Sequence, residues 1–334
     1  SGNIGNSSGT LALDKIGTGT QTLGGANTFG GPLRLRGGRL RLKAAPALAG
    51  GGQISFEGGA LMFSSGNTND YSSRFSTAAG QQYHIDTGGQ RVTFATPLTS
   101  AGGSLVKRGV GTLALQGAAH TFNGELRIGW GTLEVTSLGD SGPGSMGTGD
   151  IMMGDPAMWL GGVLRYVGAG ATTTRRVNNY GTTDTLEGFS VDASGSGPLT
   201  IGGATISGGV AASLTLTGTS AHSNTVSGVM DDGNADRLGL IKDGPGTWVL
   251  AAPNTYSGTT TIKAGRLALT GPGYIGENSV WIYEGATFDV SGKTSAYVMN
   301  ANQFLIGQGT IRGDLAVGGG VWPYYPGPGV MTFE

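Results

Sequence analysis

One block of sequence occurs three times in this chain. The copies begin at Lys15, Lys107 and Lys242 and read "KIGTGTQTLGGANTFGGPLRLRGGRLRL", "KRGVGTLALQGAAHTFNGELRIGWGTLEV" and "KDGPGTWVLAAPNTYSGTTTIKAGRLAL". Their shared skeleton is Lys, Gly-x-Gly-Thr, a strand-like run, Asn or His, Thr, an aromatic residue, Gly, and two further strand-like runs separated by Gly. An internal repeat of this kind predicts an architecture in which similar units stack on one another.

Short alternating runs of apolar and polar residues, bounded by Gly, Asn or Pro, predict β-strands with one buried and one wet face. The clearest runs are residues 33–35, 39–42, 113–115, 126–128 and 247–250. Gly makes up 67 of the 334 residues, and long stretches with helical periodicity are missing from the sequence. The sequence therefore predicts an all-β chain.

The spacing of the copies favours a solenoid. The first two lysines are 92 residues apart and the next two 135, a difference of 43. All three numbers are near multiples of about 22 residues, the length expected for one three-sided coil of short strands. We predict a right-handed parallel β-helix (β-solenoid) of roughly 15 coils. It is expected to run as a single continuous domain over residues 1–334, with repeat motifs at 15–42, 107–135 and 242–269, and C-terminal coils over 305–334 that carry an aromatic and Pro-rich loop.

Equivalent residues of the three copies are expected to build the core. Leu40, Leu133 and Leu267 should occupy equivalent core positions and stack on neighbouring coils. An inward-facing Asn can satisfy the polar groups of a buried turn, and the aromatic residue after it can fill a core corner. The structural positions predicted in this way are Asn27, His120, Asn254, Phe29, Phe122 and Tyr256.

Composition narrows the classes of function. With 20 basic and 21 acidic residues the net charge is -1, so no strong field attracts nucleic acid or an anionic membrane. No apolar run approaches the roughly 20 residues of a membrane span, and the first residues lack the regions of a signal peptide. We therefore expect a processed product or an excised segment. The sequence has no Cys, which excludes disulfides and thiolate metal sites and is compatible with export.

The repeated residues resemble a known family. The pattern Lys-x-Gly-x-Gly-Thr-x-x-Leu…Asn-Thr-Tyr-x-Gly-x-Thr-x-Ile-x-x-Gly-x-Leu of residues 242–269 is similar to the autotransporter-associated β-strand repeat, found in passenger domains of bacterial autotransporters. Residues 15–42 and 107–135 match it well. The resemblance implies a right-handed parallel β-helix that is exported and displayed, extracellular or on the bacterial cell surface. It implies no particular ligand.

Several motifs suggest chemistry but fit architecture better. "GPGSMG" (142–147) and "GPGYIG" (271–276) satisfy G-x-G-x-x-G, yet no predicted helix follows to face a pyrophosphate. "GNSSG" (5–9) lacks the strand-to-helix elbow that exposes a nucleophile. No pair of histidines has helical metal-ligand spacing; the three are His84, His120 and His222. We expect no catalytic residue, no cofactor and no metal.

An acidic loop and an aromatic loop are the remaining candidates. Asp232, Asn234 and Asp236 form a D-x-N-x-D pattern, but the Gly and Glu of an EF-hand loop are missing from their positions, so a solvated loop is expected. Between prolines, the sequence concentrates aromatic residues that are expected to cap or pack the last coil, or to contact a sugar or another protein. These residues are Trp322, Tyr324 and Tyr325.

Three functions stay open. The first is an extracellular structural protein that stacks head to tail into a surface filament or rod, since uncapped solenoid edges pair with similar edges. The second is an autotransporter passenger adhesin that binds glycans or a host or matrix protein. The third is a polysaccharide-degrading enzyme, which would need carboxylates and basic residues on one coil face. Acids are sparse, so we expect no enzyme; the candidates would be Asp184, Glu187 and Asp192.

Overall fold

The chain folds almost entirely into short parallel β-strands. The computed structural model describes residues 3–6, 9–117, 119–142, 144–155, 161–180, 188–208, 211–234, 237–323 and 330–334. Over these residues it contains 33 strands, the two short 3-10 helices Ala45–Leu48 and Ser72–Arg74, and no α-helix. Within each unit of the chain the described strands stack as turns of a β-solenoid, about 14 turns in all, close to the roughly 15 expected. The predicted fold class is confirmed.

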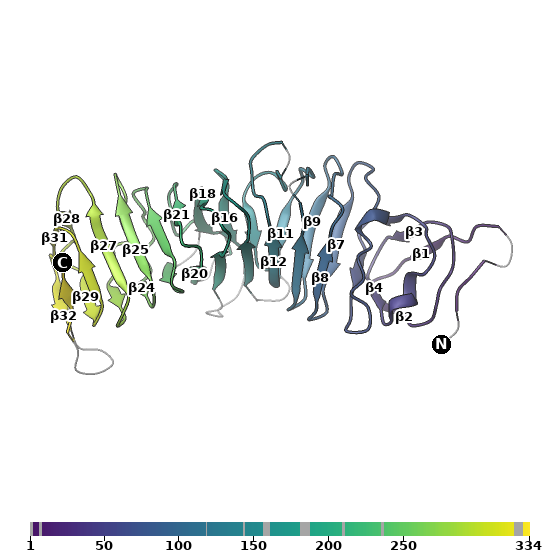
Figure 1. Ribbon diagram of the computed structural model, residues 1–334, viewed down its shortest axis with the longest axis horizontal. Coiled ribbons are helices and arrows are strands. Elements are labelled where there is room, and N and C mark those ends of the chain that lie inside the picture. Colours follow the sequence, from purple (N-terminus) through teal and green to yellow (C-terminus); the bar gives the residue numbers. More distant parts are fainter. Residues whose placement is uncertain are drawn as a thin grey trace. The chain divides into compact units, whose positions relative to one another are not determined.

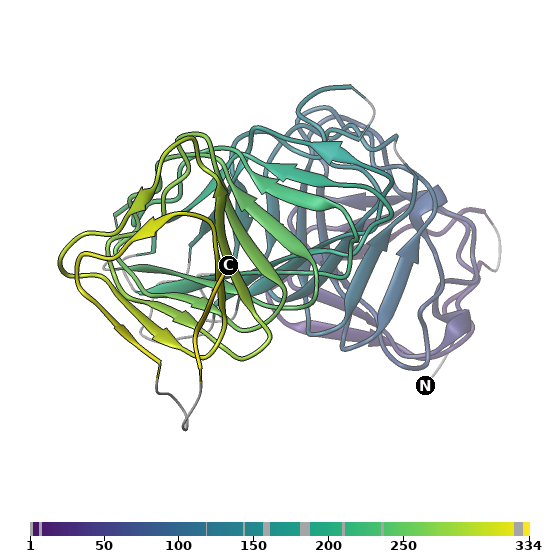
Figure 2. The ribbon, with the colours of Figure 1, turned by 60° about the vertical axis from the view of Figure 1, so that its left-hand side comes forward.

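The chain divides into two compact units, Ser1–Met152 and Met153–Glu334. In each unit, successive turns place their strands side by side, as Figures 1 and 2 show. The expectation of one continuous domain over residues 1–334 stays a prediction.

The first unit contains three sheets of parallel strands. Sheet 1 consists of β1 (Leu13–Lys15), β3 (Leu33–Leu35) and β5 (Ile54–Phe56). Sheet 2 consists of β2 (Thr20–Leu23), β4 (Arg39–Leu42), β6 (Ala60–Met62), β7 (Gln82–Asp86), β9 (Ser104–Arg108) and β11 (Leu126–Ile128). Sheet 3 consists of β8 (Arg91–Phe94), β10 (Thr112–Leu115) and β12 (Gly131–Val135). Strand β13 (Ile151–Met153) lies at the boundary between the units.

The second unit contains two long sheets and two short pairs. One long sheet consists of β14 (Gly162–Tyr166), β17 (Phe189–Ala193), β20 (Ala212–Thr217), β22 (Leu238–Lys242), β24 (Thr260–Ile262), β26 (Val280–Ile282), β29 (Phe304–Gly307) and β32 (Gly320–Trp322). The other consists of β15 (Ala171–Thr172), β18 (Leu199–Ile201), β21 (Ser223–Val226), β23 (Thr247–Leu250), β25 (Arg266–Thr270), β27 (Thr287–Gly292), β30 (Thr310–Arg312) and β33 (Thr332–Phe333). The pairs are β16 (Arg176–Asn179) with β19 (Gly203–Ile206), and β28 (Tyr297–Val298) with β31 (Leu315–Ala316).

The alternation seen in the sequence sorts side chains into inner and outer rows. In β4, Leu40 and Leu42 are buried, whereas Arg39 and Arg41 lie on the outer face. Because parallel strands pair in register, each inner residue meets an inner residue of the next turn, as Leu40 meets Leu61. The core of each unit is therefore a set of apolar rows that run perpendicular to the strands.

One expectation about the repeats is wrong. Leu40, Leu133 and Leu267 are all buried, but Leu40 lies in sheet 2 and Leu133 in sheet 3 of the first unit, so they do not share a row. The assumed constant turn length is the cause. Paired residues are as close in sequence as Phe304 and Gly320, 16 apart, and as distant as Ala171 and Leu199, 28 apart. Copies of the motif therefore need not begin on the same sheet.

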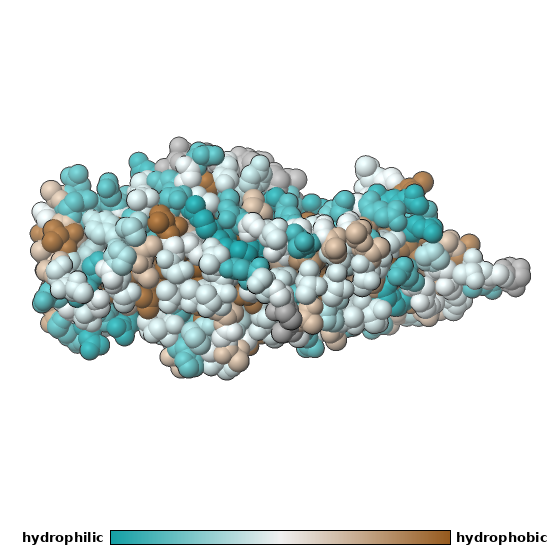
Figure 3. Space-filling model, turned by 90° about the horizontal axis from the view of Figure 1, so that it is seen from above, coloured by the Kyte–Doolittle hydropathy of each residue, from teal (hydrophilic) through white to brown (hydrophobic). Residues whose placement is uncertain are grey.

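Figure 3 shows a face dominated by hydrophilic and intermediate residues, with the most hydrophobic ones confined to small separate patches. Among the described residues, no helix has both the length and the apolar character needed to span a bilayer.

Candidate functional site

Each repeat begins with a lysine that lies inside the core. Lys107 pairs in register with Ile85 and Ile128, in an otherwise aliphatic inner row. It is 0% exposed, as is Lys242, and Lys15 is 8% exposed. Lysine is rarely buried unless it has polar partners. The sequence reading missed this role, although the recurrence of Lys at the same motif position in all copies was visible.

Three carbonyl oxygens surround each of these ammonium groups. Lys242 Nζ donates hydrogen bonds to the carbonyl oxygens of Asp243 (2.8 Å), Gly244 (2.7 Å) and, from the following turn, Ala264 (2.9 Å). Lys15 and Lys107 bond in the same way to the next two residues and to one residue of the following turn. An ammonium group has three N–H donors, and all three are used. The lysine thus closes one corner and joins it to the next turn.

Burial opposes the charge on these lysines. It lowers the pKa of Lys107 to about 7, partly offset by the charge of Asp86. It lowers the pKa of Lys242 to about 8, partly offset by Asp243. The desolvation of the ammonium group therefore cancels part of what its hydrogen bonds contribute.

A glycine of the following turn packs directly on the lysine corner. Gly38, Gly131 and Gly265 occupy this place in the three copies, with φ of 60°, 69° and 65°. A Cβ on Gly265 would lie 2.5 Å from the carbonyl oxygen of Gly244 and 2.6 Å from that of Gly246. The spacing Lys-x-Gly-x-Gly followed by a later Gly thus describes two stacked corners.

The Asn of the motif bridges three successive turns. Asn254 Oδ1 accepts from the Met230 N–H of the previous turn (2.8 Å), and its Nδ2 donates to the Tyr274 carbonyl of the next (2.7 Å). Asn27 makes equivalent bonds to the Ile4 N–H (2.8 Å) and the Ala47 carbonyl (2.8 Å). Each Asn therefore satisfies backbone groups that the strand ladders leave at the corners.

His120 takes this place in the second copy, but its side chain contacts the previous turn and its own turn instead of both neighbouring turns. Its Nδ1 accepts from the Leu98 N–H of the previous turn (3.1 Å), and its Nε2 lies 3.2 Å from the Gln116 carbonyl oxygen. The aromatic residues that follow are all 0% exposed; they are Phe29, Phe122 and Tyr256. These inward groups of the motif contact other parts of the chain, so the motif serves the scaffold.

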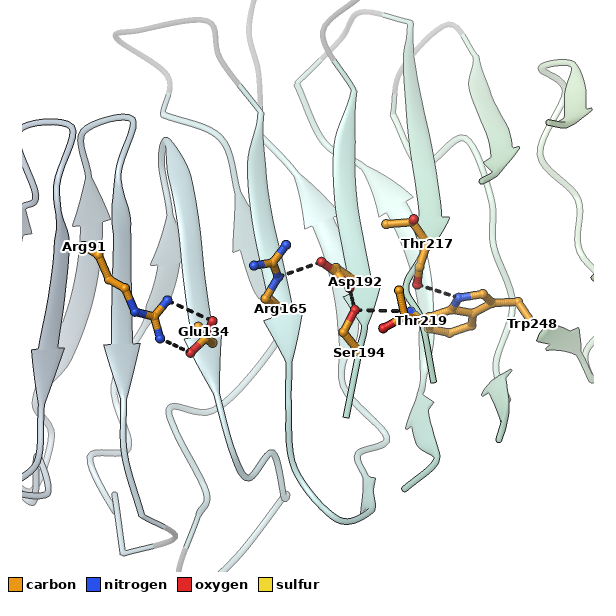
Figure 4. Close-up of polar contacts among 8 residues, drawn as sticks. All are labelled: Arg91, Glu134, Arg165, Asp192, Ser194, Thr217, Thr219 and Trp248. Carbon is orange, nitrogen blue, oxygen red and sulfur yellow. Dashed lines mark hydrogen bonds and ion pairs between the residues drawn. The ribbon is translucent and has the colours of Figure 1, made fainter. Parts of the chain in front are cut away.

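On the outer face of the first unit, an ion pair spans two turns. Arg91 on β8 reaches past β10 to Glu134 on β12, with nitrogen–oxygen distances of 3.1 and 2.5 Å (Figure 4). The register partner of Glu134 on the intervening strand is Ala114, whose small side chain leaves room for the guanidinium. The arginine side chain is 55% exposed, so the pair contributes little stability.

Asp192, a candidate carboxylate of the enzyme hypothesis, is bonded to a residue of the neighbouring strand and to one that follows its own strand. Its Oδ2 accepts from Arg165 Nε (2.7 Å) and its Oδ1 from Ser194 Oγ (2.5 Å), as Figure 4 shows. Ser194 Oγ in turn accepts from the Thr219 N–H (3.2 Å). The other two carboxylates of the enzyme hypothesis, Asp184 and Glu187, lie outside the described residues.

The acidic loop is tied to backbone groups. Asp232 accepts from the N–H groups of Leu238 (2.7 Å) and Ser257 (3.0 and 3.1 Å). Asn234 is exposed, and Asp236 lies outside the described residues. Within the described part of the chain, no three His, Asp or Glu side chains lie together in the manner of metal ligands.

Of the three aromatic residues of this loop, the structure describes Trp322 alone. This side chain is 56% exposed and lies against Phe304 of the preceding turn, with ring centroids 4.9 Å apart. Tyr324 and Tyr325 lie outside the described residues, and so do Ser7 and Ser8 of the G-x-S-x-G match.

A comparison with known protein families matches the same three repeats. The family model described as the passenger-associated-transport-repeat matches residues 13–42, 105–135 and 240–269. The chain therefore carries three passenger-associated-transport repeats. The passenger-repeat chain is also 31% identical over 256 residues to an adhesin, the BmaC autotransporter of Brucella suis biovar 1 (strain 1330). That similarity covers 72% of the passenger-repeat chain but only 7% of the adhesin. No solved structure matches the passenger-repeat chain.

The three passenger repeats agree at most inner positions and vary more at outer ones. Lys, the stacked Gly and the buried Leu or Val recur, whereas the outer position held by Arg41 is Glu134 in the second repeat and Ala268 in the third. The same outer position is therefore an exposed Arg in the first repeat, a partly exposed Glu in the second and a buried Ala in the third.

The second passenger repeat should be sensitive to acid because of His120. Burial lowers the pKa of this histidine, and a proton on Nδ1 would face the Leu98 N–H. A histidine with a folded-state pKa below its unfolded value of roughly 6.5 binds its proton better when unfolded, so stability falls as the pH drops below that value. We expect a slope of at most about 1.4 kcal/mol per pH unit from this group.

The variant His120→Asn supplies the matched control, because it restores the residue of the other repeats. Urea unfolding between pH 7.5 and 5 should show a smaller loss of stability in this variant than in the wild type. The pKa of His84 is also lowered, by burial and by the charge of Arg108, so the difference between the two proteins is the relevant measurement. Parallel pH profiles would contradict the assignment.

Proposed function

We propose that this chain is a section of a surface-displayed adhesin passenger, in which the solenoid is a scaffold and its outer residues contact the partner. The observation that carries the proposal is the division of roles within the repeats. Recurring polar side chains such as Lys242 and Asn254 turn inward to backbone groups, while the outer positions differ between copies. The similarity to the Brucella adhesin supports an adhesive role, exposed outside the cell or on its surface.

Adhesion can be measured with the purified chain. Fluorescent beads coated with it should attach to cultured mammalian cells or to surfaces coated with extracellular matrix, and soluble chain should compete. Beads coated with urea-unfolded and quenched chain are the control for stickiness. Equal attachment of folded and unfolded chain, or none above bare beads, would contradict an adhesive role.

Assembly of the chain with itself stays a second candidate. Residues 1–152 contain 11 basic and 8 acidic residues, whereas residues 153–334 contain 9 and 13. This opposite charge would favour a head-to-tail contact between copies. Sedimentation of the purified chain tests it: a concentration-dependent increase in size supports the filament, and a monodisperse monomer at high concentration argues against it.

We also infer that the chain is not an enzyme. Asp192 is held by Arg165 and Ser194, which supports a structural role for it. Depolymerisation of an acidic polysaccharide that is lost in Asp192→Asn would overturn this inference.

A further inference from the structure

The strongest charge feature of the first unit lies on one turn. Between residues 16 and 56 the sequence contains no acidic residue, yet it has five basic residues within the ten positions 34–43. We call these residues the basic belt: Arg34, Arg36, Arg39, Arg41 and Lys43. They alternate with buried leucines along β3 and β4, so all five point to the outside of the same turn.

Carboxylates lie closest to one end of the basic belt. Arg34 lies 3.2 Å from Asp14, and Arg36 lies 3.2 Å from Asp14 and 3.4 Å from Glu57. The other end has little compensation. Arg39 is 3.9 Å from Asp86, and the exposed Arg41 and Lys43 form no ion pair with any described residue.

The other repeats show that the scaffold does not require these charges. The belt positions are occupied by Arg127, Gly129, Thr132, Glu134 and Thr136 in the second repeat, and by Thr261, Lys263, Arg266, Ala268 and Thr270 in the third. Where the third repeat keeps an arginine, Arg266, it pairs with the buried Asp289 at 2.5 Å. The third repeat has a single exposed belt-position cation without an ion pair to a described residue, Lys263, whereas the first has two close together on one strand end, Arg41 and Lys43.

We propose that the basic belt binds a linear anionic polysaccharide along β3 and β4. Neighbouring outer side chains on a strand repeat every two residues, roughly 6.6 Å, which is within the Debye length of about 8 Å at physiological salt, so their fields add. This inference rests on the proposed adhesive role, and it specifies the chemical class of the partner.

Shape and side-chain chemistry favour a polysaccharide over other polyanions. The belt passes from β3 to β4 around the Gly37–Gly38 corner, which a chain can follow and a flat membrane cannot. Beside it, on the preceding turn, the exposed Thr20 and Thr22 pair in register with Arg39 and Arg41 and offer hydroxyl groups to a sugar. Single-stranded nucleic acid is bound through aromatic platforms, and the aromatic residues next to the belt, Phe29 and Phe56, are 0% exposed.

The test variant carries Arg39→Thr, Arg41→Ala and Lys43→Thr, residues that the other repeats hold at these positions. The matched control removes three exposed charges from the second unit, with Arg237→Thr, Lys263→Thr and Arg312→Thr. Both variants change the net charge by the same amount, and circular dichroism with urea unfolding establishes that each is folded.

Binding is measured by surface plasmon resonance to immobilised heparin, to polygalacturonate and to neutral dextran. We expect binding to heparin, polygalacturonate or both, weakened by added salt and about tenfold by the belt variant, but hardly by the control. The first two polymers separate sulfate from carboxylate recognition. Binding to neither, or equal loss in both variants, overturns the proposal; so does tighter binding to single-stranded DNA or to phosphatidylserine vesicles. Cell attachment of the folded chain with no polysaccharide binding would leave the adhesive role standing and reject the belt.

Discussion

Gly265→Ala should destabilise the second unit by about 3 kcal/mol or more, as measured by urea unfolding. Two effects add at this position. An alanine at φ 65° is strained by roughly 1–2 kcal/mol. Its Cβ would also lie within 2.6 Å of the carbonyl oxygens of Gly244 and Gly246, which belong to the preceding turn and cannot move without opening the lysine corner.

Gly271→Ala separates these two effects. Gly271 has a φ of 52°, and a Cβ there would meet nothing within 4 Å. This variant should therefore show the backbone strain alone, about 1–2 kcal/mol. Equal losses for the two variants would mean that contact between stacked turns does not explain the glycine of the motif.

Replacing Lys242 by Met should cost about 2–4 kcal/mol, because three buried carbonyl oxygens lose a donor. Methionine has a similar length and no donor, so the change removes the hydrogen bonds to Asp243, Gly244 and Ala264 with little change in packing. The lowered pKa of Lys242 shows that burying the ammonium group is itself costly, which keeps the expected loss below the sum of three charged bonds.

Lys263→Met is the control for this variant, because Lys263 is exposed on the same repeat. Its effect should stay within about 0.5 kcal/mol. Hydrogen exchange should also become faster around residues 242–265 in Lys242→Met and not in Lys263→Met. If Lys242→Met were as stable as the wild type, the buried lysine would be dispensable and its recurrence would need another reason.

Alternation of residue types was sufficient to predict the strands and the parallel stack. In runs such as Arg39–Leu42, the alternation of Arg and Leu indicates which side chains face the core and which face solvent. The recurrence of the motif indicates that similar units stack on one another. The place of each repeat on the sheets could not be predicted, because turn lengths vary with the loops at the corners. Leu40 and Leu133 are equivalent in sequence and nevertheless lie in different sheets.

The role of the lysines was missed for a physical reason. Lysine is normally a surface residue, and only the three-dimensional corner shows that Lys107 Nζ reaches the carbonyl oxygens of Arg108, Gly109 and Trp130. The role of Asn254 as a corner residue followed from the motif, but its bonds to both neighbouring turns depend on the stacking geometry. The basic belt was visible in the sequence as a stretch free of acids, yet net charge averaged over the chain concealed it.

The short sequence separation between paired residues has a kinetic consequence. Lys15 meets Leu35, and Leu35 meets Phe56, so each rung needs only the next two dozen residues or so to form. Contacts this local allow folding to advance as a front, with no need to wait for distant segments.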